Sequence, residues 1–370
     1  MSMILKSPSK YVQGMNVLQQ LDQYLQGMGK SLLILISESG TRRIGPVLEQ
    51  CFAGTDYTIR YEIFRGECSQ PQIDRLVERA KTEASTVVVG IGGGKILDTA
   101  KGVAYYAGLP VVIIPTVAST DSPSSSLSVI YRDNGEFDRY LFLNRCPDMV
   151  LVDTNVIAKA PAKLLVAGMG DAMATYFEAR ACRASGSDNQ VAGKPTLAAG
   201  GLATMCWRYL QKEGKAAKKA VEAGVCNASL ETIVEVNTYL SSVGFESGGL
   251  AAAHAIQKGF TFIPQLHKQY HGCKVAFCTL VQLVMEKAWE EVSQVLQFCT
   301  DVGLPVCFSD MGYEAPEPEL LQKAAEKACV AGSTIHHMPF PVTPQMVQEA
   351  MLRADEIGKA YEVTGIFESK

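Results

Sequence analysis

Short apolar runs alternate with amphipathic segments over roughly the first 160 residues of the chain. The segments at 32–36, 57–64, 86–91, 111–115 and 149–152 are rich in branched and aromatic side chains, as strands are. Between them, residues 45–52, 70–81 and 96–106 have the apolar spacing of helices. Strands that alternate with helices predict a parallel sheet covered on both faces.

The strand pattern ends near residue 161. Long segments rich in Ala, Leu, Glu and Lys follow, separated by glycine- and proline-marked turns at 168–170, 186–193, 248–249, 303–305 and 339–344. They predict a helical bundle. We therefore expect two domains, an α/β domain over residues 1–160 and an all-α domain over residues 161–370.

A glycine triplet joins an expected strand to an expected helix. Gly92, Gly93 and Gly94 end a β-branched run, and a helix-forming segment begins at Lys95. Glycines let a backbone approach an anion closely, and the helix start adds free N–H groups and the positive end of its dipole. The order of the glycines differs from both the dinucleotide and the P-loop patterns. The turn is either a pyrophosphate site or simply a tight turn.

Composition narrows the class of protein. The net charge of −4 argues against a general nucleic-acid binder. No apolar run reaches the roughly 18 residues of a membrane span, and the first residues lack a signal-peptide core. The 11 cysteines include no Cys-x-x-Cys pair, which indicates reduced thiols in a cytoplasmic protein.

Histidine is scarce, and its placement suggests a metal site. The chain has 5 histidines, of which His254 and His271 lie near glycines in the helical half. Asp171 begins an apolar helical segment after another glycine pair. One carboxylate and two imidazoles from three helices would hold a metal and leave a position open for substrate. Asp171 could equally be a helix cap, and the spacing leaves the choice between His267 and His271 open.

A polar segment follows one of the expected strands at 116–126. It contains 7 hydroxyl side chains and Asp121. The segment could be an ordinary polar loop with a cap. Alternatively, its uncharged donors and acceptors could bind nicotinamide, ribose or a polyol.

At these motifs the chain resembles the glycerol dehydrogenases of the metal-dependent (iron-containing type) alcohol dehydrogenase family. The matching stretches cover nearly the whole chain, at 7–14, 92–101, 115–131, 168–181, 237–259, 271–277 and 335–339. The resemblance implies a Rossmann-like N-terminal domain that binds NAD and a helical C-terminal domain that holds zinc, a dehydroquinate synthase-like fold. It also implies a homo-oligomer, often an octamer.

The resemblance implies roles for individual residues. The family's metal ligands fall on Asp171, His254 and His271, which resolves the choice left open by spacing. The expected cofactor contacts are Ser37, Gly92, Gly93, Gly94, Lys95, Asp98, Thr116, Ser119, Ser125, Leu127 and Tyr131. The expected catalytic residues are Asp121 and the metal ligands; the substrate contacts are Asp121, Phe245, His254 and His271.

Three positions near the expected metal ligands depart from the family pattern. Gln257 stands where a second histidine is usual, Lys258 replaces a small polar residue, and Cys273 replaces a glutamate. If the usual histidine relays protons, Gln257 implies a slower enzyme or a different substrate, because an amide does not titrate near neutrality.

A fourth departure concerns the adenosine end of the cofactor. Ser37 stands where many members have an acidic residue, and Glu38, Arg42 and Arg43 follow. Loss of that carboxylate beside arginines is a pattern that tolerates a 2′-phosphate. NAD is the expected cofactor and NADP the alternative.

The expected reaction is oxidation of glycerol, or a related 1,2-diol, to dihydroxyacetone by hydride transfer to NAD from a zinc-bound alkoxide. Fe²⁺ is the alternative metal. Two rival functions are a dehydroquinate synthase-like lyase and a nucleotide-binding descendant without turnover. A lyase with a phosphate-bearing acidic substrate needs a basic cluster, for which Asp121 among serines is unsuited.

Overall fold

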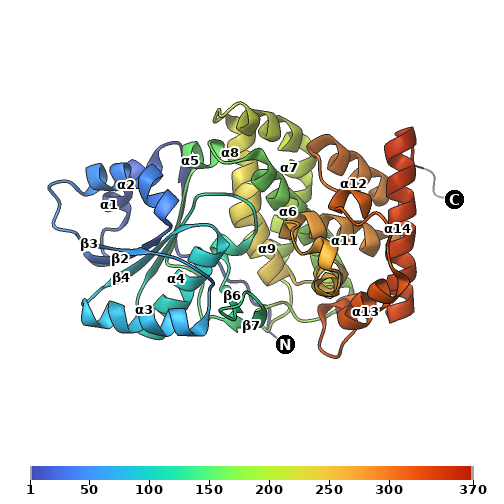
Figure 1. Cartoon of the computed structure of the whole chain (residues 1–370), viewed down its shortest axis with the longest axis horizontal. Coiled ribbons are helices and arrows are strands. Elements are labelled where there is room, and N and C mark those ends of the chain that lie inside the picture. Colours follow the sequence, from blue (N-terminus) through green and yellow to red (C-terminus); the bar gives the residue numbers. More distant parts are fainter. Residues whose placement is uncertain (1, 368–370) are drawn as a thin grey trace. The chain divides into compact units, whose positions relative to one another are not determined.

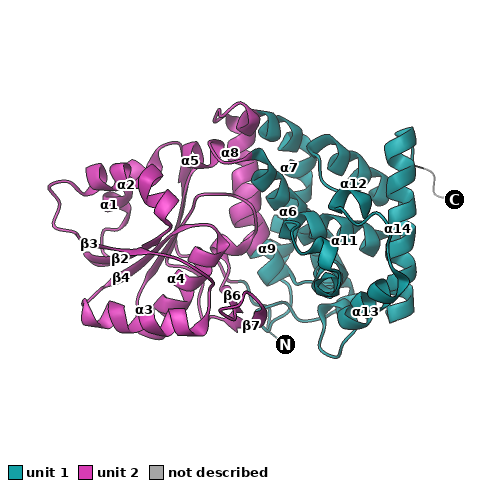
Figure 2. Ribbon diagram, in the orientation of Figure 1, with its two compact units in different colours: residues 1–5, 162–219, 243–370 teal, residues 6–161, 220–242 magenta. Residues whose placement is uncertain are grey.

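The computed structural model describes residues 2–367, and the chain forms two compact units (Figures 1 and 2). The sheet unit comprises residues 6–161 and 220–242. The helical unit comprises the described parts of residues 1–5, 162–219 and 243–370. The segment 220–242, which we expected in the helical domain, thus belongs to the sheet unit.

The sheet unit is built on a six-stranded sheet whose paired strands are all parallel. The strand order is β1-β8-β5-β4-β2-β3. Its strands are β1 (Tyr11–Gly14), β2 (Ser31–Ile36), β3 (Thr58–Ile63), β4 (Val87–Gly92), β5 (Val111–Pro115) and β8 (Met149–Asp153). The predicted parallel sheet is confirmed. Strand β1 was not predicted, because its 4 half-buried residues form no apolar run.

Helices cover both faces of this sheet (Figure 1). They are α1 (Leu21–Tyr24), α2 (Glu38–Phe52), α3 (Gln70–Thr82), α4 (Gly94–Ala107), α5 (Thr154–Ala158) and α8 (Ala228–Glu235). On one face Ile34 and Ile36 pack with Leu48 of α2. On the other face α4 approaches β4 closely, since a Cβ atom on Gly90 would lie 2.6 Å from the Cβ of Ala100.

Helix α2 begins earlier than predicted. We expected a helix over residues 45–52, and it starts at Glu38. The Oγ of Ser37 accepts the N–H of Gly40 at 3.0 Å, so Ser37 is its N-cap. The apolar spacing is weak in the first turns, which is why the pattern alone missed them.

A two-stranded antiparallel hairpin, β6 (Leu127–Tyr131) and β7 (Phe137–Phe142), completes the strands of the sheet unit and was also missed. The other helices of the chain are α6 (Ala162–Ser185), α7 (Leu197–Glu222), α9 (Ser241–Gly248), α10 (Ala252–Gly259), α11 (His271–Glu286), α12 (Trp289–Val302), α13 (Pro318–Ala328) and α14 (Pro344–Thr364). A π-helical turn, Val236–Leu240, lies between α8 and α9. The short 3-10 turns are Val17–Gln20, Ser122–Ser124, Phe260–Phe262, Pro264–Leu266, Ser309–Met311 and Thr334–His337. No named strand follows β8 within the described residues, which confirms the predicted helical second half.

Candidate functional site

Several of the expected cofactor residues follow directly on three neighbouring strands. Strands β2, β4 and β5 are adjacent, with Ile36 opposite Ile91 and Gly92 opposite Pro115. The N–H of Thr116 donates to the carbonyl of Gly92 at 2.9 Å, which fixes the two loops side by side. The chain leaves β2 toward β3 but leaves β4 toward β5, in opposite directions along the sheet. Ligands of such sheets bind beyond the carboxyl ends at this switch point.

The glycine turn leads directly into α4. Gly93 is the N-cap and Gly94 the first residue of that helix. A Cβ atom on Gly94 would meet no atom within 4 Å, so the helix start is open to a ligand. The Lys95 ammonium lies 2.5 Å from a carboxylate oxygen of Glu67, at the surface of the sheet unit. The backbone here thus has the features of an anion site, and pyrophosphate binding at this turn stays a prediction.

Leu127 and Tyr131, two further predicted contacts, both lie on β6. Burial, and next the Asp98 carboxylate, raise the pKa of the Tyr131 phenol to about 12. Tyr131 therefore stays protonated at neutral pH and can act as a hydrogen-bond donor.

Asp98 is a predicted cofactor contact whose carboxylate is engaged inside the protein. It lies 2.9 Å from the Lys101 ammonium, accepts the hydroxyl of Ser122 at 2.9 Å and accepts the N–H of Val129 at 3.1 Å. The Lys101 side chain is fully buried and also donates to the carbonyls of Ser122 and Leu127. This ion pair ties α4 to the loop after β5 and to β6. The predicted contact of Asp98 with the cofactor stays a prediction.

Replacing Lys101 with methionine should destabilise the protein strongly. The change leaves the Asp98 charge buried without its partner, which costs about 3–5 kcal/mol. Urea titration followed by circular dichroism measures the loss. The double variant Lys101→Met with Asp98→Asn should recover part of that stability, because no buried charge is left. Equal stability of Lys101→Met and the unmodified chain would contradict a buried ion pair.

The π-helical turn and the start of α9 hold the polar loop 116–126 in place. The Asn237 amide donates to the carbonyl of Ala118 at 2.9 Å, and the Ser124 hydroxyl donates to the carbonyl of Thr238 at 2.7 Å. Ser242 donates to the carbonyl of Asp121. The bond of the Ser124 hydroxyl fits the interpretation of the segment as an ordinary polar loop. The interpretation as a ligand-binding segment stays open for its other hydroxyls. π-Helical turns often mark functional segments, but no sequence pattern had indicated this one.

The structure sorts the side chains of that loop by exposure. Ser125 is buried and its hydroxyl donates to the carbonyl of Ser122 at 3.0 Å. Ser119 and Asp121 are half-buried, so solvent reaches both. One carboxylate oxygen of Asp121 lies 3.5 Å from the Ser241 hydroxyl. Asp121 and Ser119 are therefore the predicted residues of this loop that are open to a ligand.

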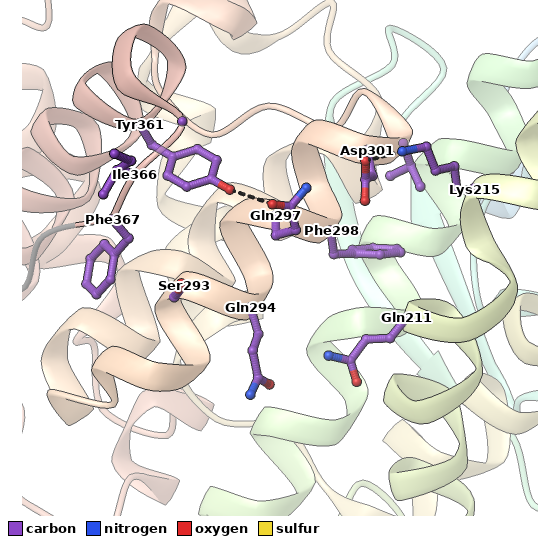
Figure 3. Close-up of a pocket in the computed structure, with 12 residues that line it drawn as sticks. Gln211, Lys215, Ser293, Gln294, Gln297, Phe298, Asp301, Tyr361, Ile366 and Phe367 are labelled. Carbon is purple, nitrogen blue, oxygen red and sulfur yellow. Dashed lines mark hydrogen bonds and ion pairs between the residues drawn. The ribbon is translucent and has the colours of Figure 1, made fainter.

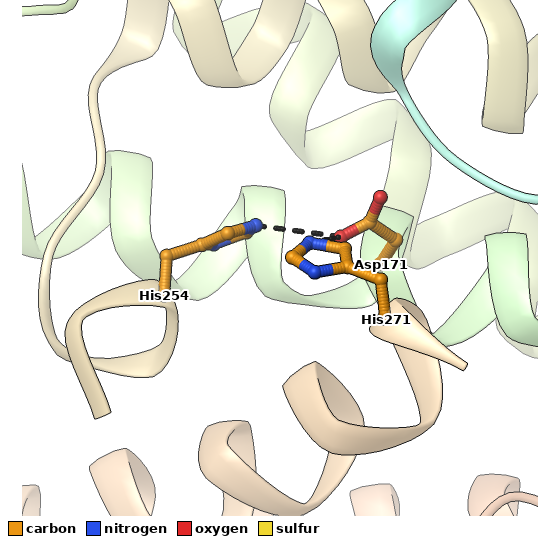
Figure 4. A group of neighbouring side chains, drawn as sticks. All are labelled: Asp171, His254 and His271. Carbon is orange, nitrogen blue, oxygen red and sulfur yellow. Dashed lines mark ion pairs between the residues drawn. The ribbon is translucent and has the colours of Figure 1, made fainter. Parts of the chain in front are cut away.

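The predicted metal ligands lie together in the helical unit (Figure 4). Asp171 of α6, His254 of α10 and His271 of α11 offer ligand atoms that all lie within 4.8 Å of one another. The Nε2 atoms of His254 and His271 lie 3.4 and 3.2 Å from Oδ1 of Asp171. His267 points elsewhere, since its Nε2 lies 2.9 Å from the carbonyl of Thr261. Of these two histidines, His271 is the one that lies in the cluster, and its role as a metal ligand stays a prediction.

Glycine brings two of these ligands together. A Cβ atom on Gly272 would lie 1.7 Å from the carbonyl oxygen of Ala167, and one on Gly170 would lie 2.4 Å from the carbonyl oxygen of Gly272. Helices α6 and α11 therefore cross with their backbones in contact. Asp171 and His271 are the chain neighbours of these two glycines. The close crossing places both side chains at the same point.

The electrostatics of the cluster favour a cation. Burial raises the pKa of Asp171, but the two imidazoles outweigh this effect of burial and bring the pKa below its usual range. Of the two imidazoles, His271 has the larger effect. Burial lowers the pKa of His254, but the carboxylates of Glu178 and Asp171 outweigh it and raise the pKa well above its usual range. Two buried carboxylates thus demand positive charge here. A carboxylate with two imidazoles is a donor set for Zn²⁺ or Fe²⁺.

The remaining expected residues lie on α9, α10 and α11. Phe245, the predicted substrate contact, is buried on α9. Gln257 and Lys258 lie on α10 and are half-buried, and desolvation lowers the pKa of Lys258. Cys273 lies on α11, where burial raises the pKa of its thiol to about 11. That thiol is therefore neutral at physiological pH.

A separate cavity of about 630 Å³ lies between α7, α12 and the end of α14 (Figure 3). Gln297 accepts the Tyr361 hydroxyl at 2.9 Å on its wall, and Lys215 pairs with Asp301 at 2.6 Å. None of the predicted site residues is among those that line it.

Comparison with known proteins identifies the class. The profile of the family described as iron-containing alcohol dehydrogenase matches residues 8–154. Glycerol dehydrogenase of Escherichia coli is 48% identical over 98% of this chain and 99% of its own. Glycolaldehyde reductase of Halobacterium salinarum is 42% identical over 97% of this chain and 99% of its own. The crystal structure of glycerol dehydrogenase from Schizosaccharomyces pombe, 33% identical, matches with a TM-score of 0.94 over 99% of this chain and 94% of that one.

The chain belongs to the iron-containing alcohol dehydrogenase family. Within it, the chain matches glycerol dehydrogenases over nearly its whole length. The expected family and fold are confirmed. None of the helices in residues 2–367 is both long enough and apolar enough to cross a membrane.

Proposed function

We propose that the protein oxidises glycerol to dihydroxyacetone and reduces NAD⁺ to NADH, with release of a proton. The single observation that carries this proposal is the cluster of Asp171, His254 and His271 within 4.8 Å in a chain 48% identical to a glycerol dehydrogenase. The glycine turn and the loop after β5 add the features expected of a dinucleotide site.

The three ligand side chains would hold one divalent ion, with zinc as the proposed metal and iron as the alternative. When bound, the ion would act as a Lewis acid that lowers the pKa of a polyol hydroxyl. Asp171 supplies one negative charge, and the imidazoles of His254 and His271 supply neutral nitrogen donors. Three protein ligands are typical of catalytic sites, which leave a position for substrate.

NAD, when bound, would accept the hydride removed from the secondary carbon of the polyol. The N–H groups at the start of α4 would bind its pyrophosphate, and the half-buried Ser119 and Tyr131 offer hydrogen-bonding groups for its other parts. Asp121 would accept a hydrogen bond from a substrate hydroxyl or take up its proton through water. The half-exposed carboxylate of Asp121 is suited to that role.

An assay of the purified chain with glycerol, NAD⁺ and Zn²⁺ tests the proposal through the absorbance of NADH. Activity should disappear when a chelator removes the ion and return when Zn²⁺ is added. A chain that holds one divalent ion but oxidises no polyol would overturn the proposed substrate. A fully active chain without any metal would overturn the proposed site.

Replacing Ser37 with aspartate should shift the cofactor preference toward NAD. Ser37 caps α2 at the end of β2, and aspartate caps helices equally well. The neighbouring Glu38 is paired with Arg42 at 3.1 Å and with Arg65 at 3.7 Å. A carboxylate at position 37 would accept from the ribose hydroxyls and repel a 2′-phosphate. One charged hydrogen bond changes the ratio of kcat/KM for NAD and NADP by about tenfold or more.

Ser39→Asp is the control for that experiment, because it adds a charge in the same helical turn but not at the strand end. It should leave the ratio of kcat/KM values near that of the unmodified chain. An unchanged ratio in Ser37→Asp would contradict a cofactor ribose at this position.

Small diols and hydroxy-carbonyl compounds form the second candidate substrate class. The relative from Halobacterium salinarum is named for glycolaldehyde, whose reduction is the reverse of the oxidation of a 1,2-diol. A panel of glycerol, 1,2-propanediol, 2,3-butanediol and glycolaldehyde, run with NAD(H) and with NADP(H), ranks these substrates by kcat/KM. The lyase alternative finds no support among the relatives at 42–48% identity, which are named as dehydrogenases or a reductase.

Two further predictions accompany this function. The protein forms a homo-oligomer, for which an octamer is the expected size, and it resides in the cytoplasm. Light scattering of the purified chain measures the mass of the assembly.

A further inference from the structure

Helix α10, which carries His254, has no N-cap of its own. Its N-cap position is Ala251, whose side chain accepts no hydrogen bond, and the first helical residues are Ala252 and Ala253. The first N–H groups of a helix have no partner within the helix, and buried N–H groups need one. All these residues are buried. The partners must therefore come from elsewhere.

Two buried side chains from other helices supply them. Glu178 of α6 accepts the N–H groups of Ala251 and His254 on Oε1, at 2.9 and 3.0 Å. Gln282 of α11 accepts the N–H groups of Ala252 and Ala253 on its Oε1, at 3.2 and 3.1 Å. Both side chains have no exposed surface. The start of α10 is thus fastened to the same two helices that carry Asp171 and His271.

Unlike Gln282, whose amide nitrogen donates to the carbonyl of Phe177 and to Glu286, Glu178 also contacts a predicted metal ligand. Its second oxygen, Oε2, lies 2.5 Å from Nδ1 of His254. A carboxylate at this position accepts the hydrogen bond of Nδ1–H, which leaves Nε2 as the nitrogen that would bind an ion. That Nε2 is the atom that lies 3.4 Å from Asp171. One carboxylate thus fixes the position and the ring orientation of His254.

The surroundings of Glu178 suit a negatively charged side chain. The positive end of the α10 dipole and two N–H groups stabilise its charge. Asp171 and Glu178 together bring two negative charges to the buried cluster, which a divalent cation neutralises. Glu178 lies seven residues after Asp171 on α6, two helical turns along the same face.

We infer that Glu178 is a positioning residue that sets the affinity of the site for a divalent ion by holding His254, beyond its effect as a helix cap. The inference rests on the metal site of the proposed function. Partners of this kind change metal affinity by about 10–100-fold when they are removed. Nothing in the sequence pattern distinguished Glu178 from other helical glutamates.

The test measures binding of Co²⁺ to the full-length apoprotein by competition with a chromophoric chelator, together with the visible spectrum of the Co²⁺-loaded chain. Glu178→Gln cannot accept all three hydrogen bonds and lacks the charge. It should bind Co²⁺ about 10–100-fold more weakly and show an altered d–d spectrum. Glu178→Asp keeps the charge but is one methylene shorter. Its Co²⁺ affinity should lie between those of the unmodified chain and Glu178→Gln. It takes the place of Glu178→Gln in the test if that variant does not fold.

Gln282→Met is the control, because it removes the other half of the same cap and touches no metal ligand. It should lower the melting temperature of the apoprotein while its Co²⁺ affinity and spectrum stay close to those of the unmodified chain. Equal loss of affinity in Gln282→Met and Glu178→Gln would overturn the inference in favour of a cap alone. Unchanged affinity and spectrum in the Glu178 variants would also overturn it. An unmodified chain that binds no divalent ion would instead overturn the proposed function together with the inference.

Discussion

Replacing Asp171 with asparagine should leave the purified protein without its divalent ion and reduce kcat/KM for glycerol by about 10³-fold or more. The expected size follows from the several kcal/mol that Lewis-acid stabilisation contributes, at about 1.4 kcal/mol for each factor of ten. Asparagine keeps the volume of the side chain but removes the one negative charge among the three ligands. Both imidazoles lie within 3.4 Å of that carboxylate, so its charge lies at the centre of the cluster.

Metal content by mass spectrometry and steady-state kinetics check this expectation. Asp355→Asn is the control, since Asp355 is also a buried aspartate of the helical unit. It accepts the N–H of Phe308 at 2.8 Å and pairs with Lys359, away from the cluster. It should lower stability but retain one ion per chain. An Asp171→Asn protein with a full complement of metal and normal turnover would contradict the site.

Much of the site could be predicted because its chemistry is carried by rare residues at marked positions. The glycine triplet stands at the junction of a strand and a helix, and the structure places it at the carboxyl edge of the sheet. With 5 histidines in the chain, few combinations of ligands were possible. Spacing alone nevertheless left His267 and His271 equivalent. Their difference is the direction of each side chain, which depends on the turn before α11.

The residues that support the site could not be predicted, because their roles depend on contacts between segments that are far apart in the sequence. Glu178 and Gln282 look like ordinary helical residues, and only the packing of α6 and α11 around α10 gives them N–H groups to accept. Asn237 holds the loop after β5 from a segment more than 100 residues away in the chain. Lys101 has the sequence context of a surface lysine, yet it lies fully buried beside Asp98. Such residues are found by asking where each buried polar group finds its partner.

The last large effect concerns the crossing of α6 and α11. Replacing Gly272 with alanine would place a Cβ atom 1.7 Å from the carbonyl oxygen of Ala167. A backbone oxygen in a packed helix cannot turn aside as a flexible side chain can, so the two helices must separate. Overpacking of this kind costs about 3 kcal/mol. Since Asp171 and His271 flank the contact, the same displacement should abolish binding of the divalent ion.

Gly201→Ala provides the control, because Gly201 lies inside α7 where a Cβ atom would meet nothing within 4 Å. Alanine there should stabilise the protein by about 0.5–1 kcal/mol, since glycine is the weaker helix former. Urea titration of the apoproteins separates loss of folding from loss of metal. A Gly272→Ala protein with normal stability and normal Co²⁺ affinity would show that the helices do not touch at this point. The ligand cluster would then need another physical cause, because two side chains on separate helices share an ion only when their backbones are held at a fixed distance.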